Sequence, residues 1–171
     1  MGWGAPWASF FLSATKDAQY LFPLSKLGYG IEMSHYGKGA AAERELIHRL
    51  FDVGFAVVRV AGSGKSSLPA PDILALSPGQ KFCIEVKAVI APNLFIPKYQ
   101  MLELADWGRR GGIIPLIAWK VPRDWFYLTP EDFHETGKNF GISRHEAKAH
   151  STPFEVLVGR QTQLTKANKN A

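Results

Sequence analysis

The chain has 171 residues, a formal net charge of +5 and a sequence pI of about 9.4. Its length is enough for one domain with a real hydrophobic core. A hydrophobic content of 46% and a charged content of 20% are typical of an ordinary globular protein. The positive charge favours an anionic partner, nucleic acid first. The single cysteine, Cys83, excludes an internal disulfide and a cysteine-based zinc cluster.

No run of apolar residues is long enough to span a bilayer. No basic start precedes an apolar stretch, so a secretory signal is not expected either. We therefore expect a cytoplasmic protein without a membrane partner. Residues 1–33 mix aromatic residues with glycines and prolines, and we interpret them as an N-terminal extension, with Met33 as an alternative start. Residues 34–160 are expected to form one domain, and residues 161–171 a polar tail.

Hydrophobic spacing and β-branched runs predict alternating helices and strands. In chain order these are a helix (39–53), three strands (55–61, 72–76, 82–89), a helix (98–110) and two strands (113–120, 125–128). Residues 91–97 contain two prolines and are expected to be a loop. In the second helix, Met101, Leu102, Leu104 and Ala105 are expected to point inward. Beyond Thr129 the pattern weakens: a short helical turn is expected at residue 130, and residues 154–158 fit a strand or a helix.

The glycine-rich loop VVRVAGSGKSS, residues 57–67, ends like a nucleotide-binding loop. A P-loop has a first glycine five residues before the Gly-Lys pair, and here that position is Arg59. The loop should also run straight into a helix, but Pro69 and Pro71 follow and block one. We therefore expect no nucleotide cofactor.

Glu43 is the first of three acidic residues in unusual positions. On a helix it shares a face with Leu46, Ile47 and Leu50, near the centre of the apolar stripe, whereas Glu45 falls on the opposite, solvated face. A carboxylate that faces a core is costly unless it is paired or bound to a metal. The alternative is that Glu43 lies in the first helical turn, faces water and complements the helix dipole.

Glu85 and Asp72 lie on neighbouring predicted strands. Glu85 and Lys87 form an opposite-charge pair on one strand face, which alone would suit a solvated face with an ion pair. Asp72 opens the preceding strand and alone would suit a turn. Two strands joined by a tight turn can bring the two carboxylates side by side, and oxygen ligands suit Mg²⁺ or Mn²⁺. Lys87 can then hold or help deprotonate a water for metal-assisted attack on a phosphate.

The spacing of Pro71-Asp72 and Glu85-Val86-Lys87 resembles the PD-(D/E)XK nuclease superfamily. The resemblance extends to the archaeal Holliday junction resolvases of the Hjc/Hje type, over roughly residues 38–120. The motifs that carry it are KGAAAEREL (38–46), GFAVVR (54–59), AGSG (61–64), PDI (71–73) and IEVK (84–87). It implies an α/β restriction-endonuclease-like fold, with a central mixed five-stranded β-sheet flanked by helices.

The resemblance also implies roles for individual residues. Asp72, Glu85 and the Val86 carbonyl would bind Mg²⁺, with Mn²⁺ as a substitute, and Glu43 would reach the metal directly or through water. Lys87 would position the attacking water. Ser63 would contribute to catalysis near the scissile phosphate. The residues expected to contact DNA are Lys38, Arg44, Arg59 and Lys65. Gln100 matches a supporting glutamine of related nucleases, in a looser alignment.

The implied activity is metal-dependent nicking of opposed strands in four-way DNA junctions by a homodimer, in recombination and repair at the nucleoid. Residues 161–164 contain only the start of a sliding-clamp motif, so at most a weak clamp contact is expected. Two alternatives stay open: a nuclease of this superfamily with a flap, mismatch or restriction-type target, and a junction-binding module without catalysis. The five histidines lack metal-ligand spacing and are expected on the surface. Trp107, Trp119 and Trp125 are expected in the core or a dimer interface.

Overall fold

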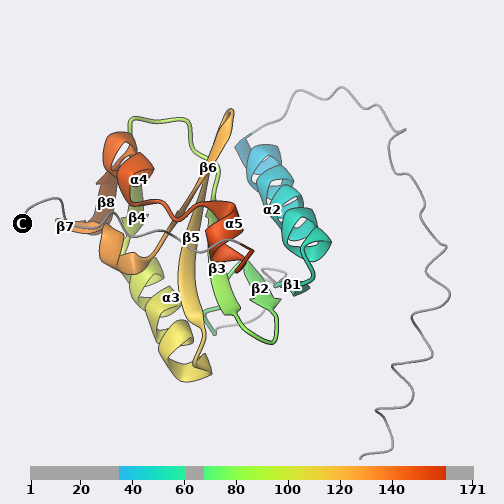
Figure 1. Ribbon diagram of the computed structural model, residues 1–171. Coiled ribbons are helices and arrows are strands. Elements are labelled where there is room, and N and C mark those ends of the chain that lie inside the picture. Colours follow the sequence, from blue (N-terminus) through green and yellow to red (C-terminus); the bar gives the residue numbers. More distant parts are fainter. Residues whose placement is uncertain (1–34, 61–67, 161–171) are drawn as a thin grey trace, which may run out of the picture. The chain divides into compact units, whose positions relative to one another are not determined.

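The computed structural model describes residues 35–60 and 68–160, and Figure 1 shows their arrangement. A five-stranded sheet forms the centre of this part of the chain, with strand order β1-β2-β3-β5-β6. Its strands are β1 (Ala56–Arg59), β2 (Ile73–Leu76), β3 (Lys81–Lys87), β5 (Ile114–Val121) and β6 (Asp124–Leu128). Strands β3 and β5 pair in parallel, and the other neighbours pair antiparallel. The sheet is therefore mixed and five-stranded, which confirms the fold class expected from the sequence.

Helix α2 (His35–Asp52) covers one face of this sheet. Ala42, Leu46 and Leu50 recur at three- and four-residue steps and are buried against it. The helix ends at Asp52, and Gly54 in the turn that follows has a φ of 97°, in the left-handed region that favours glycine. The chain then turns directly into β1.

Helix α3 (Lys98–Gly111) packs against the opposite face, in a second apolar cluster. Met101 and Leu104 point inward as expected, but Leu102 is 61% exposed, so its predicted burial was wrong. Leu102 directly follows Met101, and a step of about 100° turns it off the buried stripe. Gly112, with φ 59°, ends the helix as its C-cap.

A second, three-stranded sheet was not expected from the sequence. It has the order β4-β8-β7 and consists of β4 (Asn93–Pro97), β8 (Asn139–Ser143) and β7 (His134–Thr136). The prediction of a loop over residues 91–97 was therefore wrong. Among the described strands, β4 pairs only with β8, and an edge strand can hold a proline because one side of it needs no N–H donors.

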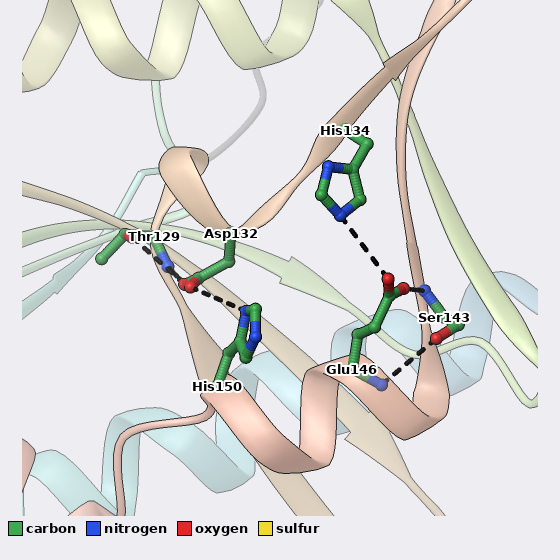
Figure 2. Close-up of polar contacts among 6 residues, drawn as sticks. All are labelled: Thr129, Asp132, His134, Ser143, Glu146 and His150. Carbon is green, nitrogen blue, oxygen red and sulfur yellow. Dashed lines mark hydrogen bonds and ion pairs between the residues drawn. The ribbon is translucent and has the colours of Figure 1, made fainter. Parts of the chain in front are cut away.

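The remaining elements are η1 (Pro130–Asp132), α4 (Arg144–His150) and α5 (Phe154–Leu157). The helical turn expected at residue 130 is confirmed, and residues 154–157 form a helix rather than a strand. Figure 2 shows how α4 is fixed: Ser143 and Glu146 cap its start reciprocally, with hydrogen bonds of 2.9 and 3.2 Å. His134 and His150 lie 3.5 and 3.4 Å from Glu146 and Asp132.

The structure also tests several smaller expectations. The histidines with described side chains, His48, His134, His145 and His150, are exposed, as predicted. Trp119 and Trp125 are buried in the two apolar clusters, which confirms their place in the core. Among the described residues, no helix is both long and apolar enough to cross a membrane.

Candidate active site

The hairpin of β2 and β3 brings Asp72 and Glu85 together. Ile73 on β2 pairs with Ile84 on β3, so the next position along each strand sets Asp72 against Glu85. Both residues line one cavity of about 190 Å³ at this end of the hairpin. The side-by-side arrangement expected from the sequence is therefore present.

The Asp72 carboxylate is held by the neighbouring strand and is partly buried. The backbone N–H of Val86 donates a hydrogen bond of 2.8 Å to its Oδ2. Burial raises the pKa of Asp72 to about 6, and the negative charges of Glu85 and Glu43 act in the same direction. The hydrogen bond from Val86 and the charge of Lys87 oppose this rise in pKa. A cation bound here would relieve the repulsion that raises it.

Lys87 links β3, the strand that carries Glu85, to helix α3. Its Nζ donates to Oε1 of Glu85 at 2.6 Å and to Oε1 of Gln100 at 3.3 Å. The side chains of Lys87 and Glu85 are 21% and 17% exposed, so the pair is partly shielded from water. The expected Glu85–Lys87 pair thus lies at the cavity, and Gln100 lies beside it.

Helix α3 forms the opposite wall of the cavity. Besides Gln100, the residues that it contributes are Tyr99, Glu103, Leu104 and Trp107. The indole N–H of Trp107 donates a hydrogen bond of 2.7 Å to the carbonyl of Pro69, just before Asp72. No role was predicted for Tyr99 and Glu103, although residues 99, 103 and 107 follow at four-residue steps on one helical face. Because this helical face lies next to Gln100, the four-residue spacing could have predicted that Tyr99 and Glu103 line the site.

Glu43 does not line this cavity. Its Oε2 accepts a hydrogen bond of 2.8 Å from Nε of Arg59, and it forms an ion pair with Nη2 of the same guanidinium, also at 2.8 Å. It nevertheless lies close enough for its charge to raise the pKa of Asp72. Among the described residues, no group of three or more His, Cys, Asp and Glu side chains is arranged to hold a metal ion. Asp72 and Glu85 therefore line the cavity from the strand side and Glu103 from helix α3, whereas Glu43 is held by an arginine.

The other predicted site residues are only partly described. Ser63 and Lys65 lie outside the described residues, as does the loop of residues 61–67 that carries them. Lys38 lies within helix α2, but the structure does not describe its side chain. Arg44 is exposed, and the Arg59 side chain is 50% exposed.

The donor set at the cavity fits a hard divalent cation. Mg²⁺ is commonly bound through one or two carboxylates and keeps several of its waters. Asp72 and Glu85 supply two such carboxylates, and the backbone at Val86 lies against Asp72. A cavity of about 190 Å³ leaves room for bound waters.

Comparison with known proteins decides the family. Residues 34–166 match the family model described as archaeal Holliday junction resolvase (Hjc). The chain belongs to this family. Its members bind four-way DNA junctions, and nucleases of this kind are metal-dependent.

Individual Hjc proteins cover most of the same region. The crossover junction endodeoxyribonuclease Hjc of Archaeoglobus fulgidus is 37% identical over 106 residues, which are 61% of this chain and 78% of that protein. The Hjc of Sulfolobus acidocaldarius is 29% identical over 128 residues, or 74% and 90% of the two chains. The solved structure of A. fulgidus Hjc, a Holliday junction resolvase, matches with a TM-score of 0.66 and 30% identity. That match covers 74% of this chain and 99% of the other.

Proposed function

We propose that this Hjc-family chain is a crossover junction endodeoxyribonuclease, which binds four-way DNA junctions and nicks opposed strands by phosphodiester hydrolysis. The observation that carries the proposal is the pair of carboxylates, Asp72 and Glu85, on adjacent strands of one cavity with Lys87 beside them. The activity would resolve recombination intermediates, in the cytoplasm at the nucleoid.

Asp72, Glu85 and the carbonyl of Val86 would hold Mg²⁺, for which Mn²⁺ can substitute. When bound, the ion supplies a Lewis acid for the phosphoryl oxygen and a water of lowered pKa. The strong hydrogen bond from Val86 N–H keeps one Asp72 oxygen oriented, which leaves the other oxygen available as a ligand. Charge balance supports this assignment, because two adjacent carboxylates repel one another unless a cation lies between them.

Lys87 would position the attacking water and offset the charge that develops on the phosphate. Glu85 and Gln100 hold its Nζ at the cavity through hydrogen bonds of 2.6 and 3.3 Å. A lysine held by one carboxylate and one amide stays within reach of a water bound beside Asp72. Gln100 acts here as a positioning residue, since it contacts Lys87 rather than the reacting atoms.

DNA would be held by basic residues. We assign phosphate contacts to Lys38, Arg44, Arg59 and Lys65, and a catalytic contribution near the scissile phosphate to Ser63. Such contacts supply most of the affinity for DNA without reading its sequence. Two opposed nicks need two active sites, so we propose a homodimer as the working form. The weak clamp contact stays a prediction.

The test compares DNA substrates under one condition. A labelled synthetic four-way junction, a linear duplex of the same sequence and a flap are incubated with the full chain in Mg²⁺. We expect paired nicks in the junction at a rate at least ten times that for the other two. Preferred cutting of the duplex or the flap would instead support another target in the same superfamily. Junction binding without any nicking in Mg²⁺ or Mn²⁺ would support a non-catalytic module.

A further inference from the structure

The ion pair between Glu43 and Arg59 joins two residues with proposed roles in the site. Arg59, at the end of β1, directs both Nε and Nη2 to the same oxygen, Oε2, of Glu43 on α2. Glu43 is mostly buried, with 19% of its side chain exposed, whereas Arg59 is 50% exposed. The carboxylate is thus covered, and the guanidinium that covers it faces solvent.

The ion pair competes with a second interaction of each residue: cation binding by Glu43 and phosphate binding by Arg59. Glu43 lies near Asp72 but does not line the cavity that Asp72 and Glu85 share. While Arg59 occupies its Oε2, the carboxylate is not available as a ligand for a cation in the cavity, and the charge of the arginine offsets part of its attraction for one. Arg59, in turn, is a planar donor whose fork matches a phosphate as well as it matches a carboxylate. A DNA phosphate and the Glu43 carboxylate therefore compete for one guanidinium.

We propose that Arg59 couples metal binding to DNA binding: it holds Glu43 in the free protein, and a DNA backbone phosphate takes its place. The released Glu43 carboxylate then joins Asp72 and Glu85 at the cation site, directly or through water. This inference rests on the proposed nuclease function. Thermodynamic linkage requires the converse as well, so a bound cation increases the affinity of the protein for DNA by the same factor.

The expected size of the effect follows from the exposure of the pair. Ion pairs that are open to solvent on one side stabilise by at most about 1 kcal/mol, which is roughly a fivefold change in an equilibrium constant. The pair should therefore weaken cation binding to the DNA-free chain by about three- to fivefold.

The decisive measurement is Mn²⁺ binding to the full chain without DNA, followed by the paramagnetic signal of the free ion. Arg59→Gln is expected to bind Mn²⁺ about three- to fivefold more tightly than wild type. Arg44→Gln is the matched control, because Arg44 is an exposed arginine next to Glu43 along the chain. It removes the same charge and is expected to change the affinity by less than twofold.

A double-mutant cycle separates release of Glu43 from simple loss of positive charge. In a Glu43→Gln background, Arg59→Gln should give no gain in Mn²⁺ affinity. An equal gain in that background, an equal gain in Arg44→Gln, or no gain at all would overturn the proposal. Arg59→Lys provides a second variant, which keeps the charge but not the two-donor contact, and an intermediate gain is expected.

A second measurement tests the DNA half of the coupling. The affinity for a four-way junction is measured with and without Ca²⁺, and the ratio gives the coupling factor. It should fall in Arg59→Gln and in Glu43→Gln, and an unchanged factor in both would overturn the proposal. Junction cutting by wild type in Mg²⁺ is scored separately. If wild type cuts but the Mn²⁺ cycle shows no coupling, this inference fails while the nuclease function stands.

Discussion

The backbone N–H of Val86 donates a 2.8 Å hydrogen bond to the Asp72 carboxylate, so the strand that presents Glu85 also orients Asp72. The two carboxylates are therefore fixed by the same pair of strands and cannot move apart without breaking the hairpin. This arrangement crowds negative charge into a partly buried place, and the pKa of Asp72 rises to about 6 in consequence.

Asp72 should make the stability of the protein depend on pH. In the folded chain its carboxyl keeps a proton up to about pH 6, whereas its ordinary pKa is 3.8. Its contribution to the free energy of unfolding is therefore fully present below about pH 4 and is lost as pH rises through 6. In urea unfolding with EDTA, wild type should lose about 2 kcal/mol relative to Asp72→Asn between about pH 4 and pH 7.

Two controls test whether Asp72 causes this pH dependence of stability. Asp52→Asn changes an exposed aspartate at the end of α2 and should leave the wild-type pH profile in place. Mg²⁺ added above pH 6 should stabilise wild type more than Asp72→Asn, because it binds the folded chain at the carboxylates. Parallel profiles for wild type and Asp72→Asn would show that Asp72 has an ordinary pKa.

Gln100 should affect catalysis more than junction binding. Gln100→Ala removes the acceptor that shares Lys87 with Glu85, and Lys87 then has greater freedom at the cavity. We expect the single-turnover cleavage rate to fall by about tenfold, with the Kd for the junction changed by less than twofold. Gln80→Ala, in the turn between β2 and β3, serves as the control and should keep the wild-type rate. A loss confined to Kd would contradict the positioning role.

Trp107 should matter for the segment that leads into Asp72. Trp107→Phe keeps an aromatic ring but removes the N–H that binds the Pro69 carbonyl at 2.7 Å. Loss of one such bond costs about 1 kcal/mol of stability. We expect the cleavage rate to fall several-fold as well, since Asp72 lies three residues beyond Pro69.

Trp125→Phe is the matched control for Trp107. It loses a comparable bond, from its indole N–H to Glu45 Oε1 at 2.9 Å, on strand β6, which does not line the cavity. Its stability should fall, while its cleavage rate per folded molecule stays near wild type. Equal rates for Trp107→Phe and wild type would remove Trp107 from the site.

Gly108 should be intolerant of any side chain. A Cβ there would lie 2.8 Å from Cδ of Pro115 and 2.9 Å from the carbonyl oxygen of Ile113, because α3 crosses the start of β5 closely. Gly108→Ala is expected to lower the free energy of unfolding by about 1–3 kcal/mol. Gly79→Ala, which meets no atom within 4 Å, should change it little. Thermal unfolding of the two variants makes the comparison, and equal midpoints would contradict the close packing.

The main elements of the fold could be predicted because their signals are local. The spacing of Leu46 and Leu50 marks α2, and the turn between β2 and β3 sets the register that joins Asp72 to Glu85. Strand β4 was missed because Pro92 and Pro97 suggested a loop, and its strand character depends on pairing with β8, more than 40 residues later. Residues 139–143 show no hydrophobic periodicity from which the partner strand β8 could be predicted.

The site was predictable only in part, because several of its contacts join residues that are far apart in the sequence. Glu43 was placed near the apolar stripe of its helix, but its partner Arg59 is 16 residues away, on a different element. Glu45, expected on a solvated face, is exposed but also accepts hydrogen bonds from Lys120 and Trp125 of β5 and β6. Contacts of this kind depend on how helix and sheet pack, and side-chain spacing along one element does not contain that information.

The most direct test of the central claim is cleavage of a synthetic four-way junction by wild type and by Asp72→Asn in Mg²⁺. Asp52→Asn is carried through as the control, and junction binding is measured in Ca²⁺ for all three proteins. Wild type and Asp52→Asn should nick opposed strands, while Asp72→Asn should bind the junction and cut at least a thousandfold more slowly. Cleavage by Asp72→Asn at the wild-type rate would contradict the assignment of this cavity as the active site.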